Sequence, residues 1–198
     1  MEPAHRGLYR RKLPGAIDFA ARSVDVFALW GQPENEIRSF ISTARQRAGQ
    51  RDIEFSASFR IILGDTEASA WRRVAQIEET ARAVAKAASF AIPLSPLSEG
   101  ARRMRSIAAR GDVIDDNIWT GYSALCGGHG NTFALVGTPE QVALKIRVFN
   151  DLGVRKFLLR GFDTQTDIGL IGSELLPLLR APSLSQRSFP RSAEGFMQ

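Results

Sequence analysis

Cysteine and histidine are scarce in this 198-residue sequence, which contains one cysteine and two histidines, and its 26 basic residues are nearly all arginine. The single cysteine, Cys126, excludes an internal disulfide and a cysteine-based metal cage. With only His5 and His129 available, a histidine-based metal site is not expected, and we predict no metal. No apolar run reaches the roughly 20 residues needed to span a bilayer.

The chain begins with a basic segment, residues 1–14, and no apolar segment typical of a secretory signal follows it. We therefore expect a cytoplasmic protein. The composition, 44% hydrophobic and 24% charged, is typical of one globular domain, which we place at residues 15–180 before a flexible Ser-, Pro- and Arg-rich tail at 181–198. A net charge of +5 leaves nucleic acid open as a partner, but no nucleic-acid motif accompanies it, which favours a solvated arginine-rich surface.

Apolar residues follow two different periods along the chain. Strict alternation over residues 53–63 puts Phe55 and Phe59 on one strand face, while Ser58 and Arg60 lie on the other. Apolar runs predict two more strands, and helical spacing with N-cap and breaker signals predicts the helices. Strands are expected at residues 24–30, 53–63 and 154–160, and helices at residues 15–22, 33–48, 66–88, 98–110, 138–153 and 168–179.

The stretch from residue 89 to residue 133 lacks a clear period. Three glycines within residues 127–130 predict a loop there. We interpret this stretch as an insertion between two strand–helix units. Regular structure is expected again at Thr138, where the sequence T-P-E-Q predicts a helix N-terminus with a capping box closed by Gln141.

Strands that alternate with helices predict a parallel sheet with right-handed crossovers. One apolar and one polar face on residues 53–63 favours a (β/α)8 barrel, because one face of a barrel strand meets helices and the other meets the lumen. Three strands cannot close an eight-stranded barrel, so either about five strands are missing on the N-terminal side or the fold is a small open sheet. A barrel would bring Trp30, Arg60 and Phe162 to one mouth, at the C-terminal strand ends.

Four stretches resemble the luciferase-like flavin monooxygenases of the alkanesulfonate monooxygenase type. They read VDVFALWGQPENEI at 24–37, FSASFRIILGDTEASAW at 55–71, IWTGYSALCGGHGNT at 118–132 and FALVGTPEQVALKIRVFNDLGVRKFLLRGFD at 133–163. The matches follow the order of that family over roughly residues 15–180. The resemblance implies an α/β fold: the last three or so βα units of a (β/α)8 TIM barrel with the insertion at about residues 89–133, and without the N-terminal strands.

In function, the resemblance implies an FMNH2-dependent monooxygenase that oxidises a small organic substrate such as an alkanesulfonate, in truncated form. Reduced FMN would come from a separate NAD(P)H-dependent flavin reductase, and the protein would supply positioning, positive charge and exclusion of water. A homo-oligomer or a complementing N-terminal half is the expected assembly. The alternative is a catalytically inactive remnant, or an oligomerisation module that associates through its open sheet edges.

The resemblance places the catalytic positions at Arg60 and Phe162. Cofactor or substrate contacts are expected at Trp30, Ser58, Cys126, Gly127, Gly128, His129, Gly130 and Arg160. Alkanesulfonate enzymes carry arginine and then histidine where this chain has Ser58 and Arg60, arginine where it has Cys126, and tyrosine where it has Phe162. The sulfonate-binding and acid–base set of that family is therefore not reproduced.

Each of these residues also has a structural interpretation. Arg60 either binds a sulfonate, a flavin phosphate or a peroxyflavin anion, or pairs with a carboxylate inside the lumen. Arg160 has the same two interpretations. Trp30 either walls the ligand or packs in the core, and Cys126 is read more simply as a small loop or core thiol. The glycine-rich residues 127–130 form either a lid or an ordinary loop.

Overall fold

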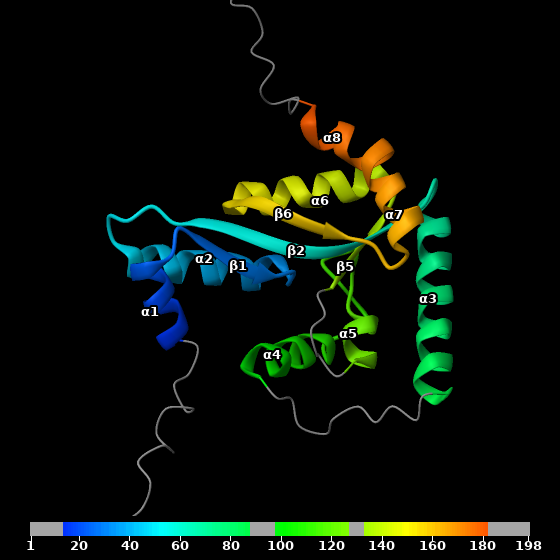
Figure 1. Cartoon of the computed structure of the whole chain (residues 1–198), viewed down its shortest axis with the longest axis horizontal. Helices are drawn as coiled ribbons and strands as arrows, with labels where there is room; N and C mark the ends of the chain where they lie inside the picture. Colours follow the sequence, from blue (N-terminus) through cyan, green and yellow to red (C-terminus); the bar gives the residue numbers. More distant parts are fainter. Residues whose placement is uncertain (1–13, 88–97, 127–132, 182–198) are drawn as a thin grey trace, which may run out of the picture.

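The computed structural model describes residues 14–87, 98–126 and 133–181 (Figure 1). The predicted basic segment up to residue 13, the glycine-rich residues 127–130 and residues 182–198 of the tail lie outside the described residues.

Three parallel strands form the centre of the sheet. β2 (Glu54–Leu63) lies between β1 (Val26–Trp30) and β6 (Val154–Arg160), as Figure 1 shows. All three occur where the sequence predicted strands, and each is separated from the next by at least one helix. A parallel arrangement follows, because the chain must cross back over the sheet before it adds each strand.

The two faces of β2 differ as the alternation predicts. Phe55 and Phe59 are fully buried on one face, under α2 (Glu34–Ala48) and α6 (Pro139–Leu152). There the ring of Phe59 packs 4.8 Å from that of Phe149. On the opposite face Ser56, Ser58 and Arg60 are half-buried. One helix-covered apolar face and one polar face are the arrangement expected of a barrel strand.

The remaining helices surround this centre. They are α1 (Pro14–Ser23), α3 (Glu67–Ala87), α4 (Glu99–Ala108), α5 (Gly121–Leu125), α7 (Thr164–Leu170) and α8 (Leu176–Arg180), with a π-helical turn, Ile171–Leu175, between the last two. In Figure 1, α4 and α5 lie on the side of the sheet away from α6, and α3 stands at its end. The final helical run begins at residue 164, not 168, because the side chain of Asp163 caps it by accepting from the amide of Gln165.

The described part of the insertion at residues 89–133 contains short strands that the sequence did not predict. β3 (Val113–Ile114) and β4 (Ile118–Trp119) form an antiparallel pair, and α5 follows them. Order returns at β5 (Ala134–Gly137), four residues earlier than expected, and β5 pairs with the last residues of β2. These strands were missed because two to four residues are too few to display an alternation.

The capping box at α6 is confirmed. The Thr138 hydroxyl accepts from the amide of Gln141 at 3.3 Å, and the Gln141 side chain accepts from the amide of Thr138 at 2.9 Å. The helix ends at Gly153, whose φ of 114° lies in the left-handed region that glycine adopts without strain. Both ends of the helix that covers Phe59 are thus fixed by local sequence.

The Thr138→Ala variant should lower the free energy of unfolding by about 1 kcal/mol, because it removes the side-chain acceptor at the start of α6. Chemical denaturation of the full chain measures this. Thr43→Ala is the matched control, since the Thr43 hydroxyl donates to the carbonyl of Ser39 in the middle of α2 and caps no helix. Equal unfolding energies for the two variants would contradict the role of the capping box.

Candidate active site

The strand register brings four of the predicted site residues onto one face. Trp30 of β1 lies beside Ser58 of β2, and Arg60 of β2 lies beside Arg160 of β6. All four are half-buried and lie on the face of β2 opposite Phe59. The register thus brings these four residues, from three different strands, onto one face of the sheet.

Arg60 is held by a carbonyl and two aromatic rings. Its Nη1 donates to the carbonyl of Gly161 at 2.7 Å, and its guanidinium lies 4.6 Å from the ring centre of Phe162 and 5.3 Å from that of Tyr122. Within the part of the chain that the structure describes, no carboxylate pairs with Arg60. The interpretation of Arg60 as a lumen arginine paired with a carboxylate is thus not what the structure shows.

Burial lowers the pKa of Arg60, the Tyr122 side chain raises it, and the positive charge of Arg160 lowers it. An arginine nonetheless stays protonated at neutral pH, because its ordinary pKa is so high. The site therefore contains a partly desolvated positive charge that the aromatic rings and one carbonyl stabilise. An anion that reached this face would be attracted.

Two buried polar atoms on the same face have no hydrogen-bond partner among the described residues. They are the Oγ of Ser58 and the Nε of Arg60. Leaving a buried donor unsatisfied costs about 1–3 kcal/mol, so such atoms commonly mark a position that a ligand or water fills. Both can donate a hydrogen bond, which again fits an anionic or oxygen-rich ligand.

An aromatic group encloses Arg60. Tyr122 and Phe162 meet edge to face with ring centres 5.0 Å apart, and the buried Trp119 lies 6.0 Å from Phe162. The sequence analysis predicted Phe162 as a site residue but not Tyr122. The one sequence feature that could have indicated Tyr122 is its position just before the glycine-rich stretch. Trp119 itself packs in the core.

Cys126 follows α5 and lies beside Tyr122. Burial raises the pKa of the Cys126 thiol, and a hydrogen bond with Tyr122 and the charge of Arg60 offset part of that rise. Burial likewise raises the pKa of Tyr122. Since a raised pKa keeps the thiol protonated, the simpler interpretation of Cys126 as a packed thiol fits its surroundings. Gly127, Gly128, His129 and Gly130 lie outside the described residues.

A cleft of about 670 Å³ opens beside this group, between α3 and α5. Its walls are mostly apolar: they include Ile77, Ala81, Val84, Tyr122, Leu125 and Phe162. Arg60 stands behind two of these rings and not in the wall itself. The size is in the usual range for small-molecule sites, about 300–1,000 Å³.

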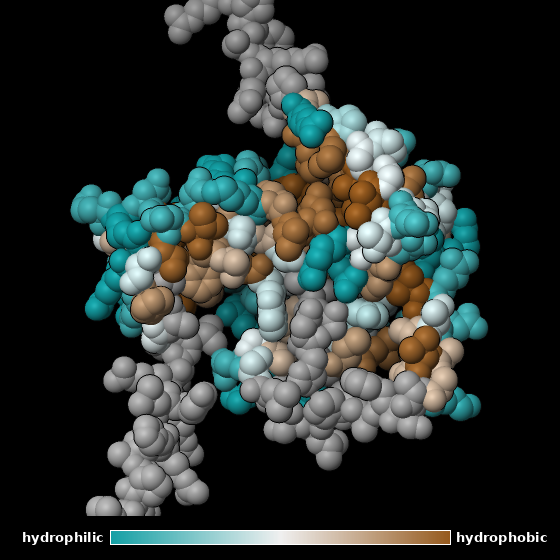
Figure 2. Space-filling model, in the orientation of Figure 1, coloured by the Kyte–Doolittle hydropathy of each residue, from teal (hydrophilic) through white to brown (hydrophobic). Residues whose placement is uncertain are grey.

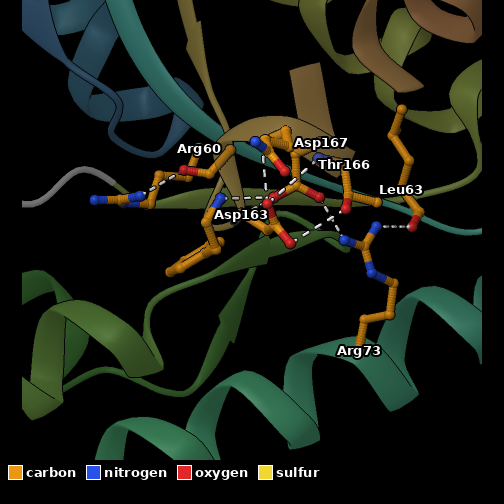
Figure 3. A network of polar contacts seen from close by, with 9 residues as sticks. Arg60, Leu63, Arg73, Asp163, Thr166 and Asp167 are labelled. Carbon is orange, nitrogen blue, oxygen red and sulfur yellow. Dashed lines mark hydrogen bonds and ion pairs between the residues drawn. The ribbon is translucent and has the colours of Figure 1, made fainter. Parts of the chain in front are cut away.

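A polar network fixes the loop that carries Phe162 (Figure 3). The buried carboxylate of Asp167 accepts from the amides of Phe162 at 2.6 Å and Asp163 at 2.9 Å, and it pairs with Arg73 of α3. Arg73 also donates to the carbonyl of Leu63 at 2.7 Å. No pattern in the sequence indicates this network, because Asp167 and Arg73 lie in ordinary helical segments 94 positions apart.

Residues 12–156 match the family model of luciferase-like monooxygenases. The chain belongs to this family. The match covers most of the sequence, including β1, β2 and the strands and helices up to the start of β6. The predicted family is thereby confirmed.

Solved structures with the same fold include a riboflavin lyase, RcaE, with modified FMN and riboflavin (TM-score 0.57, 22% identity, 83% of this chain and 40% of that chain). Another is the EDTA monooxygenase EmoA from Chelativorans sp. BNC1, with a TM-score of 0.54 and 20% identity over 89% of this chain and 45% of that chain. A third is DmoA from Hyphomicrobium sulfonivorans, with a TM-score of 0.59 and 17% identity over 83% of this chain and 39% of that chain. This luciferase-like chain thus spans less than half the length of each, and its fold is a partial (β/α)8 barrel, as predicted.

No helix among the described residues is long and apolar enough to cross a membrane. No group of three or more histidine, cysteine, aspartate or glutamate side chains in the same residues is placed to hold a metal ion.

The helix α4 packs against Trp30. Gly100 contacts the indole of Trp30 so closely that a side chain at position 100 would clash with the ring. Two ion pairs hold α4 and the turn after it against α2: Glu36 pairs with Arg103 of α4 at 2.7 Å and with Arg110 of the turn at 2.8 Å. Burial raises the pKa of Glu36, but the hydrogen bonds and charges of these two arginines outweigh it, so the pKa lies below its ordinary value of 4.5.

At pH 7 the Glu36→Gln variant should have a free energy of unfolding lower than that of the wild type by on the order of 1 kcal/mol. It should therefore unfold at a lower temperature. Because the folded-state pKa of Glu36 is lowered, its contribution is complete above pH 4.5 and is lost as the pH falls through the folded-state pKa. The difference between wild type and variant should therefore shrink in acid. Thermal unfolding at several pH values checks this, with the exposed Glu78–Arg82 pair as control: Glu78→Gln should change the unfolding temperature little. A difference that grows in acid would contradict the assignment.

Proposed function

We propose that this chain binds reduced FMN, supplied by a separate NAD(P)H-dependent flavin reductase, and takes part in the monooxygenation of a small organic substrate such as an alkanesulfonate. The observation that carries the proposal is the positively charged face at Arg60 and Arg160 in a chain of the luciferase-like family. Because the chain spans less than half of the solved structures, a complementing N-terminal half belongs to the proposal.

The residues present fit an anionic aromatic cofactor. The unpartnered Ser58 Oγ and Arg60 Nε offer donors to a phosphate or a flavin oxygen, and Arg160 adds charge. Trp30 and Phe162 offer flat apolar surfaces of the kind that stack against a ring. When bound, reduced FMN supplies the oxygen-activating chemistry, and the chain supplies orientation, charge and shielding from water.

We expect Arg60 to contribute more to cofactor binding than any other described residue. Its guanidinium is already oriented by the carbonyl of Gly161 and by two rings, so little side-chain entropy is lost when an anion binds. Charge-assisted hydrogen bonds from such a group contribute about 1.5–3 kcal/mol. Phe162 acts beside it by keeping water from the guanidinium.

Titration of the full chain with reduced FMN without oxygen, followed by flavin absorbance or fluorescence, tests the proposal. The wild type should bind saturably, with a dissociation constant of roughly micromolar size, and Arg60→Met should bind about tenfold more weakly. Riboflavin lacks the phosphate, so the two proteins should differ less for riboflavin if Arg60 meets that group. Arg82→Met, which removes an exposed arginine of α3, is the control and should bind like the wild type. No saturation up to millimolar FMN would contradict the proposal.

An interaction module is the second candidate, favoured by the open edges of the sheet. Within the described residues β1 and β6 each pair only with β2, so each has one unpaired edge. Leu158 on β6 is 59% exposed, and Figure 2 shows apolar surface gathered over β6 and the helices that follow it. Unpaired edges with exposed apolar side chains favour association between chains.

Sedimentation velocity separates the two candidates. If association through β6 is the function, the wild type should form oligomers at micromolar concentration and Leu158→Lys should shift them towards monomer. Leu144→Lys replaces an equally exposed leucine on α6 and should have no effect. A monomeric wild type would exclude self-association, whatever the FMN titration gives.

A further inference from the structure

The geometry points to Arg73 and Asp167 as positioning residues for the anion site at Arg60. Neither touches the proposed ligand face, and neither is among the positions that the family resemblance marks. The inference rests on the proposed function in one respect: the ligand that Arg60 receives is the anionic group proposed above. The positioning itself rests on contacts between described residues.

Asp167 sets the path of the loop after β6. The residue is 3% exposed, and one carboxylate oxygen, Oδ2, accepts from the amides of both Phe162 and Asp163. Gly161 packs against this carboxylate so closely that a side chain at position 161 would collide with it. The carboxylate therefore fixes Gly161 and Phe162 at the same time.

Gly161 and Phe162 are the two residues that hold Arg60. The carbonyl of Gly161 accepts the hydrogen bond from Nη1, and the ring of Phe162 lies under the guanidinium. A shift of the loop would move the acceptor and the ring together. Asp167 thus determines the direction of the Arg60 guanidinium although it does not contact it.

Arg73 connects the loop to the rest of the site. Its Nη2 pairs with Oδ1 of Asp167, the carboxylate oxygen that does not accept from the loop amides. Its Nη1 donates a hydrogen bond to the carbonyl of Leu63, at the end of β2. Figure 3 shows this bridge reaching from α3 to the loop. The same helix, α3, also forms one wall of the apolar cleft.

A positioning residue that acts through Arg60 has a distinctive thermodynamic signature. Removing it should weaken FMN binding mainly while Arg60 is present, because most of its effect passes through that side chain, and only the contact of Phe162 with the flavin ring remains without it. A residue that merely stabilises the fold would weaken binding equally with and without Arg60. The double-mutant cycle of Arg73→Met and Arg60→Met distinguishes these cases.

FMN dissociation constants should be measured for the four proteins of this cycle, at a temperature well below every unfolding transition. We expect Arg73→Met to weaken FMN binding about tenfold in the wild-type background and less than about twofold in the Arg60→Met background. Asp167→Asn should behave in the same way. Arg73→Lys, which keeps the charge but not both bonds, should recover part of the affinity. Arg82→Met is the control on the same helix.

A second measurement needs no ligand. Rings that face the Arg60 guanidinium shift the NMR resonance of its Nε–H group, and the Phe162 and Asp163 amides should be protected from hydrogen exchange by Asp167. Both signals should change in Arg73→Met and not in Arg82→Met. Unchanged signals, or equal losses of affinity in both halves of the cycle, would overturn the inference. If the wild type binds no FMN while both signals change as expected, the proposed function fails and the positioning role stands.

Discussion

The alternation of β2 is the constraint on which the rest of this structure depends. Every second residue from Phe55 to Leu63 is apolar and buried, so this strand can lie only with that face under α2 and α6. A shift of one residue would bury Arg60 under the helices and expose Phe59. Because β1, β5 and β6 all pair with β2, its orientation decides which side chains of three other strands face the site.

The site that results is assembled from segments distant in the sequence. Arg60, Tyr122 and Phe162 come from β2, α5 and the loop after β6, and they meet around one guanidinium. A half-buried charge without a carboxylate would be unfavourable, and the structure offsets this with a carbonyl and two ring faces. Such a partner set stabilises the cation without neutralising it, which keeps it available to an incoming anion.

Much of the fold follows from the sequence alone. The three long strands, the capping box at Thr138 and the chain order of the helices could be predicted, because periodicity and local capping depend on neighbouring residues. The short strands β3, β4 and β5 could not, since their pairing is decided by contacts with one another and with β2. Local signals carry no information about such tertiary pairing.

The same distinction holds for the site. Trp30, Ser58, Arg60 and Arg160 were identified from strand periodicity and family resemblance, and the register places them together. Tyr122 was missed because a five-residue helix gives no periodic signal. Arg73 and Asp167 were missed because nothing in a helical stretch distinguishes a solvated charge from one that bridges two elements.

The contact between Gly161 and Asp167 constrains how this loop can change in evolution. The space that a methyl group at position 161 would need is filled by the carboxylate at position 167. A relative with a larger residue at 161 must therefore give up the acid at 167, and with it the acceptor for two loop amides. The two positions should vary as a pair across related chains, and a relative that keeps both should keep the same loop.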